Sequence, residues 1–193
     1  TNITITDSVN KTKVDAVNNY TTGTVTVNVI ADGRADLATV AGYNNSDVTI
    51  GAAAITVTDA VTNAQADAIN LYTTGQVTLN AVTDSYAEIV NTHNLTTTDV
   101  SMAAAAVTIT DSTNKTKMDA VNNYTTGTVT ATTLVEDYDD IVTIEGTTGL
   151  SIAATNITIT DSVNKTKVDA VNNYTTGTVT VNVIADGRAD LAT

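Results

Sequence analysis

The sequence predicts an α/β repeat solenoid, in which strand–helix coils stack through a parallel β-sheet with about two coils per 52-residue unit. A strand-and-helix pattern recurs along the 193 residues, and Ile or Val alternates with Thr where strands are expected. The chain contains no Cys and no Pro. A separate domain of about 50 residues without disulfides buries little core, so the units are expected to stack on one another.

Internal repetition divides the chain into units. Residues 3–7 return in closely similar form at 55–59, 107–111 and 157–161, at offsets of 52, 52 and 50 residues. Residues 155–193 repeat residues 1–39 without a single difference. The predicted units are residues 1–54, 55–106, 107–156 and the partial unit 157–193, and we expect the chain to be a window on a longer array.

Each unit is predicted to open with a strand. In the first unit, Ile3 and Ile5 point to one face, Thr residues point to the other, and Asp7 is expected to end the strand. A helix over residues 8–20 follows, with Val14 and Val17 at helical spacing and Asp7 or the next residue as N-cap.

The rest of the unit follows from the same patterns. Gly23 is expected to close the helix in the left-handed conformation, before an alternating strand over residues 24–29. A short helix starts at Asp32, with counterparts at 84–91 and 137–144, and short strands are expected at 47–50, 99–102 and 149–152. The predicted structural core comprises Ile3, Ile5, Val14, Val17, Val25, Val27, Val29 and Leu37 with their equivalents.

Composition excludes several function classes. The chain has 21 acidic and 8 basic residues, and its net charge of −13 repels nucleic acids and anionic membrane surfaces. No apolar run approaches the roughly 18 residues of a membrane span, so membrane insertion is not expected. Without Cys, and with His93 as the single histidine, the sequence offers few catalytic groups, and we expect no enzyme.

One acidic cluster is a candidate metal site. Glu136, Asp137, Asp139 and Asp140 lie within five residues and offer the oxygen ligands that Ca²⁺ prefers. The competing interpretation is helix N-capping, which also explains Asp32 and other acidic residues at predicted turns. Ca²⁺ is the one cofactor that the sequence leaves open.

Outward threonines suggest a second function. They would form ladders along a stacked sheet and resemble the threonine ladders of ice-binding β-solenoids; the positions are Thr4 and Thr6, Thr56 and Thr58, Thr108 and Thr110, and Thr158 and Thr160. The alternative function is therefore a binding module for ice or glycans. The simpler interpretation is that Thr suits the polar face of a strand.

A resemblance to known proteins rests on residues 55–70, Ile-Thr-Val-Thr-Asp-Ala-Val-Thr-Asn-Ala-Gln-Ala-Asp-Ala-Ile-Asn, followed by Thr73-Thr74-Gly75 and Val77-Thr78. This pattern resembles tandem repeats of giant cell-surface proteins of cyanobacteria and other aquatic bacteria. The resemblance covers all four units. It implies a role in adhesion, surface layers or surface-linked motility, and it carries no active site.

The sequence therefore predicts an extracellular structural repeat protein at the cell surface. It would form a rod, filament or surface layer, or the stalk of a large adhesin. Its expected partners are other copies of itself or further repeats of the same chain.

Overall fold

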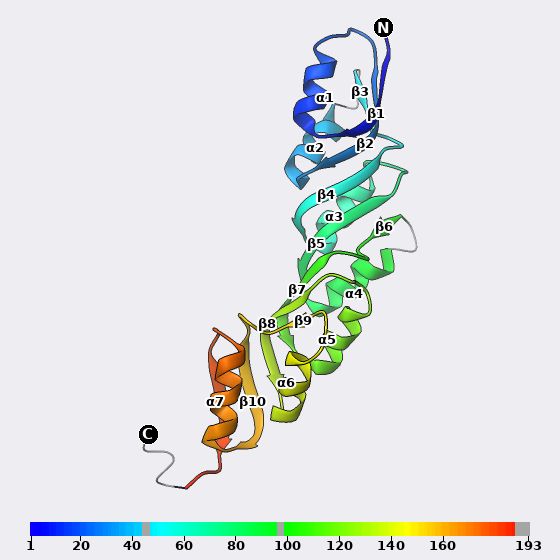
Figure 1. The fold of residues 1–193 in the computed structure, drawn as a ribbon. Coiled ribbons are helices and arrows are strands. Elements are labelled where there is room, and N and C mark those ends of the chain that lie inside the picture. The colour runs from blue at the N-terminus through cyan, green and yellow to red at the C-terminus, as the bar shows by residue number, and fades with distance from the viewer. Residues whose placement is uncertain (44–46, 96–98, 188–193) are drawn as a thin grey trace. The chain divides into compact units, whose positions relative to one another are not determined.

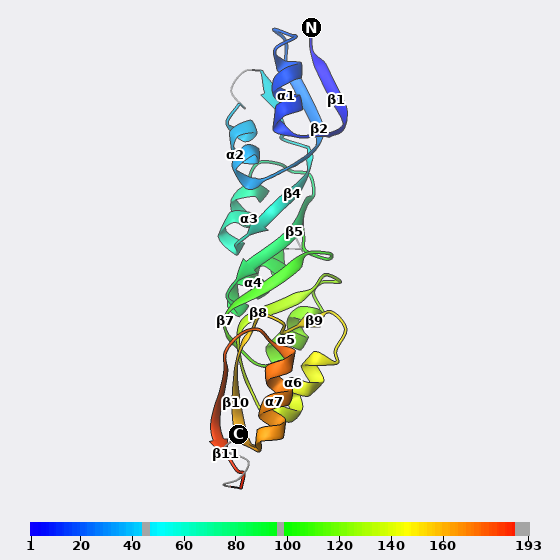
Figure 2. The ribbon, with the colours of Figure 1, turned by 60° about the vertical axis from the view of Figure 1, so that its left-hand side comes forward.

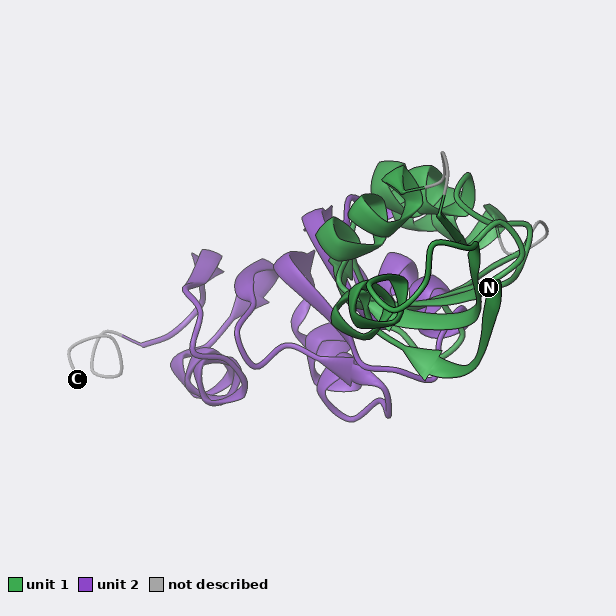
Figure 3. Cartoon of the chain, turned by 90° about the horizontal axis from the view of Figure 1, so that it is seen from above, with its two compact units in different colours: residues 1–83, 87–105 green, residues 84–86, 106–193 purple. Residues whose placement is uncertain are grey.

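A computed structural model describes residues 1–43, 47–95 and 99–187. The chain divides into two compact units, coloured separately in Figure 3: residues 1–83 with 87–105, and residues 84–86 with 106–193. Strands alternate with helices in both, and the strand pairings within each unit are parallel. The predicted α/β class with a parallel sheet is confirmed.

Unit 1 holds the first elements in chain order: β1 (Ile3–Val9), α1 (Lys11–Asn18), β2 (Val25–Asp32), α2 (Arg34–Gly42), β3 (Val48–Thr49), β4 (Ala54–Val61), α3 (Asn63–Asn70), β5 (Val77–Asp84), α4 (Tyr86–Leu95) and β6 (Val100–Ser101). The sheet order is β1-β2-β4-β5, with β3 beside β2 and β6 beside β5 (Figure 1). Helices α1, α2 and α3 lie on one side of these strands (Figure 2).

Unit 2 repeats this element order: β7 (Ala106–Thr113), α5 (Lys115–Asn122), β8 (Val129–Glu136), α6 (Tyr138–Glu145), β9 (Leu150–Ser151), β10 (Asn156–Val163), α7 (Lys165–Tyr174) and β11 (Val179–Ile184). Its sheet order is β7-β8-β10-β11, with β9 beside β8. Residues 188–193 of the predicted fourth sequence unit lie outside the described residues. No helix among the described residues combines the length and apolar character needed to cross a bilayer.

Burial separates the eight expected core residues into two groups. Val14, Val25, Val27 and Leu37 are buried, whereas Ile3, Ile5, Val17 and Val29 are only half-buried. Ile30 takes the inward position that Val29 was expected to fill.

This difference coincides with a register shift between β1 and β2. Between the pairs Ile5↔Val27 and Ser8↔Val29, β1 contributes three residue steps and β2 only two. At the shift the inward residues of β2, Val27 and Ile30, lie three positions apart instead of two, so the alternation of β2 breaks there and Val29 is only half-buried. The same irregularity recurs between β4 and β5, β7 and β8, and β10 and β11.

The first helix begins later than the sequence predicts. Strand β1 continues through Asp7 to Val9, whose side chain is buried, and α1 starts at Lys11. Asn10 is the N-cap, because its Oδ1 accepts a hydrogen bond from the backbone N–H of Lys13 at 3.1 Å. Asp7 therefore neither ends the strand nor caps α1.

Gly23 is needed for space rather than for a left-handed turn. Among the described glycines, only Gly149 has a positive φ angle, and Asn19, the C-cap of α1, lies in the right-handed region. A Cβ atom on Gly23 would lie 2.6 Å from the carbonyl carbon of Thr1, a backbone atom. The backbone after the helix therefore packs directly against the start of the preceding strand.

Candidate functional site

Carboxylates in the strands cap helices of the preceding coil, where a coil is a main strand and the helix that follows it. The Asp32 carboxylate in β2 accepts a hydrogen bond from the backbone N–H of Lys11, the first residue of α1, at 2.7 Å. Asp59 in β4 accepts one from the first residue of α2, Arg34, at 2.8 Å. Each bond joins two coils, and we call the set the capping row.

The capping row continues with four further bonds in unit 2, which includes residues 84–86 at the start of α4. Its donor–acceptor pairs are Tyr86 N to Asp111 at 2.7 Å, Lys115 N to Glu136 at 2.9 Å, Tyr138 N to Asp161 at 2.9 Å, and Lys165 N to Asp186 at 2.7 Å. A carboxylate at a helix N-terminus accepts a charge-assisted hydrogen bond and lies at the positive end of the helix dipole. The acidic residues thus hold neighbouring coils together.

The local N-caps are polar residues that the sequence analysis missed. Asn114 and Asn164 repeat the role of Asn10, and Thr62 caps α3 in a capping box with Gln65. A sequence signal was present, because each Asn stands three residues before the Lys whose amide it binds. Asp32 was expected to cap α2, but Gly33 occupies that N-cap position and makes no side-chain cap bond.

The capping row predicts a modest loss of stability for Asp59→Ala. Removing the acceptor leaves the Arg34 amide without its inter-coil partner and should lower the free energy of unfolding by about 1 kcal/mol. Asp59→Asn keeps an oxygen acceptor and should lose less. Urea unfolding measures both, and Asp67→Ala, an exposed carboxylate on α3, controls for the charge change. Equal effects of Asp59→Ala and Asp67→Ala would contradict the inter-coil cap.

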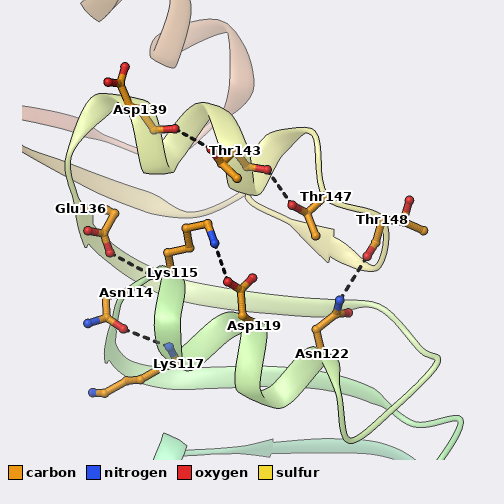
Figure 4. A network of polar contacts seen from close by, with 10 residues as sticks. All are labelled: Asn114, Lys115, Lys117, Asp119, Asn122, Glu136, Asp139, Thr143, Thr147 and Thr148. Carbon is orange, nitrogen blue, oxygen red and sulfur yellow. Dashed lines mark hydrogen bonds and ion pairs between the residues drawn. The ribbon is translucent and has the colours of Figure 1, made fainter.

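Three of the four candidate metal ligands come together in the structure. Glu136, Asp137 and Asp140 each place one carboxylate oxygen within 4.8 Å of the others, and all three are half-buried. Asp139 is exposed, and its carboxylate points away from Glu136 in Figure 4. Two members already have local roles, because Glu136 accepts from the Lys115 amide and Asp137 caps α6 through the Asp140 amide at 2.9 Å.

The helix-cap interpretation makes a prediction about calcium. Ca²⁺ takes six to eight oxygen ligands, and the cluster supplies three carboxylates of which two accept backbone hydrogen bonds. We expect calcium chloride to leave the melting temperature unchanged relative to magnesium chloride. A calcium-specific rise that Asp140→Asn removes would instead show that the cluster binds calcium. Asp67→Asn is the matched exposed control.

Lys115 places a positive charge near this cluster. Its Nζ donates to the Asp119 carboxylate at 2.5 Å (Figure 4). This hydrogen bond raises the pKa of Lys115 above its ordinary value of 10.5, and the charges of Asp119, Asp140 and Glu136 raise it further. The pKa of Lys11 is raised as well, mainly by its side-chain hydrogen bond to Asp15.

A titration tests whether the hydrogen bond to Asp119 is the main cause of the raised Lys115 pKa. Because the pKa of Lys115 is raised on folding, its contribution to stability is complete below pH 10.5 and disappears as the pH rises through the folded-state pKa. We expect Asp119→Asn to bring the Lys115 pKa back toward 10.5, as followed by NMR of the Lys side chain. Asn123→Asp, at an exposed neighbouring position, is the control for a change of charge. An unchanged Lys115 pKa in Asp119→Asn would contradict the assignment.

The threonine rows are shorter than the sequence predicts. Thr4 pairs with Thr26 and Thr26 with Thr49, but the next threonine, Thr56, pairs with Ala31, five residues further along β2. The rows are interrupted in the same way in unit 2, where Thr158 pairs with Val135 rather than with Thr130. The predicted threonine ladder along the stacked sheet is therefore wrong between β2 and β4 and between β8 and β10.

Threonine hydroxyls also bond within the sheet. The Thr108 and Thr130 hydroxyls lie 3.0 Å apart, and the Thr132 hydroxyl donates to the Thr110 carbonyl at 2.8 Å. These contacts favour the structural interpretation of the threonines.

His93, the single histidine, lies in the last turn of α4. Glu88 Oε2 accepts hydrogen bonds from the side-chain amides of Asn63 at 2.9 Å and Asn91 at 3.2 Å. Asn63 also accepts from the Thr92 hydroxyl at 3.0 Å. Glu88 therefore links α3 to α4 in unit 1.

Comparisons with known proteins add no assignment: no protein-family model, no curated protein and no solved structure matches the chain.

Proposed function

We propose that this chain is a structural repeat solenoid from an extracellular protein, in which it builds a rod, filament or surface layer, or the stalk of a large adhesin. Its work is mechanical, and its partners are further coils of the same kind.

The capping row is the observation that carries this proposal. In six described cases, a carboxylate of one coil holds the first backbone amide of the helix in the coil before it. The acidic residues that recur in the repeats thus form hydrogen bonds between coils. A protein whose repeated polar groups bind its own backbone is suited to extending a scaffold.

The turn after each main helix supports the same role. In the Thr-Thr-Gly turn of unit 1, the Thr73 hydroxyl donates to the Ala53 carbonyl at 2.6 Å and accepts from the Gly75 amide at 2.8 Å. Thr175 and Gly177 repeat both contacts with the Thr155 carbonyl in unit 2. In both cases the turn binds the residue that directly precedes the strand of its own coil, Ala53 before β4 and Thr155 before β10. The repeated threonine hydroxyl thus serves the backbone of the coil itself.

An extracellular position is supported by the absence of Cys, the acidic surface and the resemblance to cell-surface repeats. Immunogold labelling of intact cells of the source organism, with antibody raised against this chain, tests it. We expect gold on the outer surface of unpermeabilised cells. Labelling that appears only inside sectioned cells would overturn the proposal.

A further inference from the structure

A recurring Asn-Lys-Thr sequence places an asparagine at the start of three helices. Asn10, Asn114 and Asn164 are the N-caps of α1, α5 and α7, and a threonine follows each of them two residues later. The pattern Asn-x-Thr is the acceptor sequence for N-linked glycosylation, in which a sugar is attached to the asparagine side chain. Because the chain is rich in Asn and Thr, the surroundings of each match decide whether an enzyme can use it.

The cap bond orients the side-chain amide of these asparagines. Oδ1 of Asn114 accepts a hydrogen bond from the backbone N–H of Lys117 at 3.0 Å, and Nδ2 points away from the helix in Figure 4. Asn10 and Asn164 make the same bond at 3.1 and 2.9 Å. No described residue accepts a hydrogen bond from Nδ2 at these three positions. The cap therefore uses only the oxygen and leaves the nitrogen, the atom that sugars are attached to, available.

The threonine of the same sequence is accessible as well. Thr12, Thr116 and Thr166 are exposed, and none of their hydroxyls bonds to a described residue. An enzyme that recognises this acceptor sequence must reach both the asparagine and the hydroxyl two residues later. In the folded chain both groups are available at each of the three helix starts.

A second recurring match, Asn-Tyr-Thr at the ends of the same helices, lacks this access. Its threonines belong to the Thr-Thr-Gly turns, and Thr125 and Thr175 are only 6% and 8% exposed. The Thr175 hydroxyl donates to the Thr155 carbonyl at 2.7 Å and accepts from the Gly177 amide at 2.9 Å. An enzyme reaches such a hydroxyl only after the turn opens. The fold thus separates two sets of sites that share one sequence pattern.

We infer that Asn10, Asn114 and Asn164 carry N-linked sugar and that the Asn-Tyr-Thr sites do not. In the reaction, Nδ2 bonds to the anomeric carbon of a sugar that is activated as a phosphate ester on a nucleotide or a lipid. The sugar–phosphate bond breaks, the phosphate group leaves, and Nδ2 loses one of its two protons. Oδ1 is unchanged and keeps its bond to the helix amide, so the modification leaves the cap intact. This inference rests on the extracellular position proposed above.

Peptide mapping of the chain isolated from its source cells tests the inference. Mass spectrometry with electron-transfer dissociation keeps sugars attached and locates them. We expect sugar at Asn10, Asn114 and Asn164, with occupancy at least about tenfold lower at Asn123 and Asn173, whose turns must open first. Asn114 and Asn123 lie in the same sequence unit and give the most direct comparison. A chain without sugar, or equal occupancy of the two sets, would overturn the inference.

Two substitutions separate recognition of the acceptor sequence from the helix cap. Thr116→Ala, produced in the source cells, removes the hydroxyl but leaves Asn114 as N-cap, so the sugar at Asn114 should disappear. Thr116→Ser keeps a hydroxyl and should retain the sugar. Because Thr116 is exposed, both variants should keep the circular-dichroism spectrum of the unsubstituted chain. Sugar that persists on Asn114 in Thr116→Ala would contradict recognition of this sequence.

The surface labelling described above distinguishes this inference from the proposed function. A chain that carries no sugar but is labelled by immunogold on intact cells would overturn the glycosylation sites and leave the extracellular role standing. Labelling only inside sectioned cells would overturn the extracellular role itself.

Discussion

Val27→Asp is expected to destabilise unit 1 by about 4 kcal/mol or more, a large part of the stability of an ordinary domain. Val27 lies in the centre of β2, opposite Ile5 of β1, and is 2% exposed. A carboxylate there would be buried among aliphatic side chains without a partner, so it must either stay desolvated or open the sheet. We expect β1 and α1 to separate from the rest of unit 1.

Thermal and urea unfolding followed by circular dichroism measure this effect. Asn28→Asp is the matched control, because the next residue along β2 is exposed and acquires the same charge. We expect the control to change the free energy of unfolding by less than about 0.5 kcal/mol. If the melting curve of Val27→Asp superimposes on that of the unsubstituted chain, the assignment of Val27 to the core is wrong.

Gly75→Ala is expected to cost about 2–4 kcal/mol, because the added methyl group has no space. Its Cβ would lie 2.7 Å from the Ala53 carbonyl carbon and 2.9 Å from the Ala52 carbonyl oxygen, both backbone atoms. Relief of these contacts requires the turn to move away from Ala53. That movement breaks the hydrogen bond from the Thr73 hydroxyl to the same residue.

Gly42→Ala is the control for this substitution. Gly42 ends α2, and no atom lies within 4 Å of a Cβ placed there. Because Ala favours helix more than Gly does, this variant should be neutral or more stable by up to about 1 kcal/mol. Equal urea midpoints for Gly75→Ala and Gly42→Ala would show that the turn does not pack closely against the preceding strand.

Local patterns predicted the elements better than their contacts. Alternation of Ile and Thr located the strands, and helical spacing located α1 through Val14. The exchange of Val29 for Ile30 could not be predicted, because both residues are apolar and the alternation of β2 breaks where its register with β1 shifts.

The sequence also could not predict which residues contact one another in the folded chain. Asp32 was correctly associated with helix capping, but it binds the helix 21 residues earlier instead of its own. Gly23 was assigned to a left-handed turn because glycine often serves that purpose, whereas here its value is the absence of a side chain. Contacts of this kind depend on how coils align, which no single unit of sequence specifies.

The alignment of neighbouring coils is the central claim, and disulfide formation in unit 1 tests it most directly. Ala31 and Thr56 are partners across β2 and β4, so cysteines at these positions lie within the range that a disulfide spans. We predict that Ala31→Cys/Thr56→Cys closes an intramolecular disulfide on mild oxidation, as shown by mass spectrometry. Thr26→Cys/Thr56→Cys, about 16 Å out of register, should remain reduced. Closure of the second pair and not the first would contradict the staggered register on which the capping row depends.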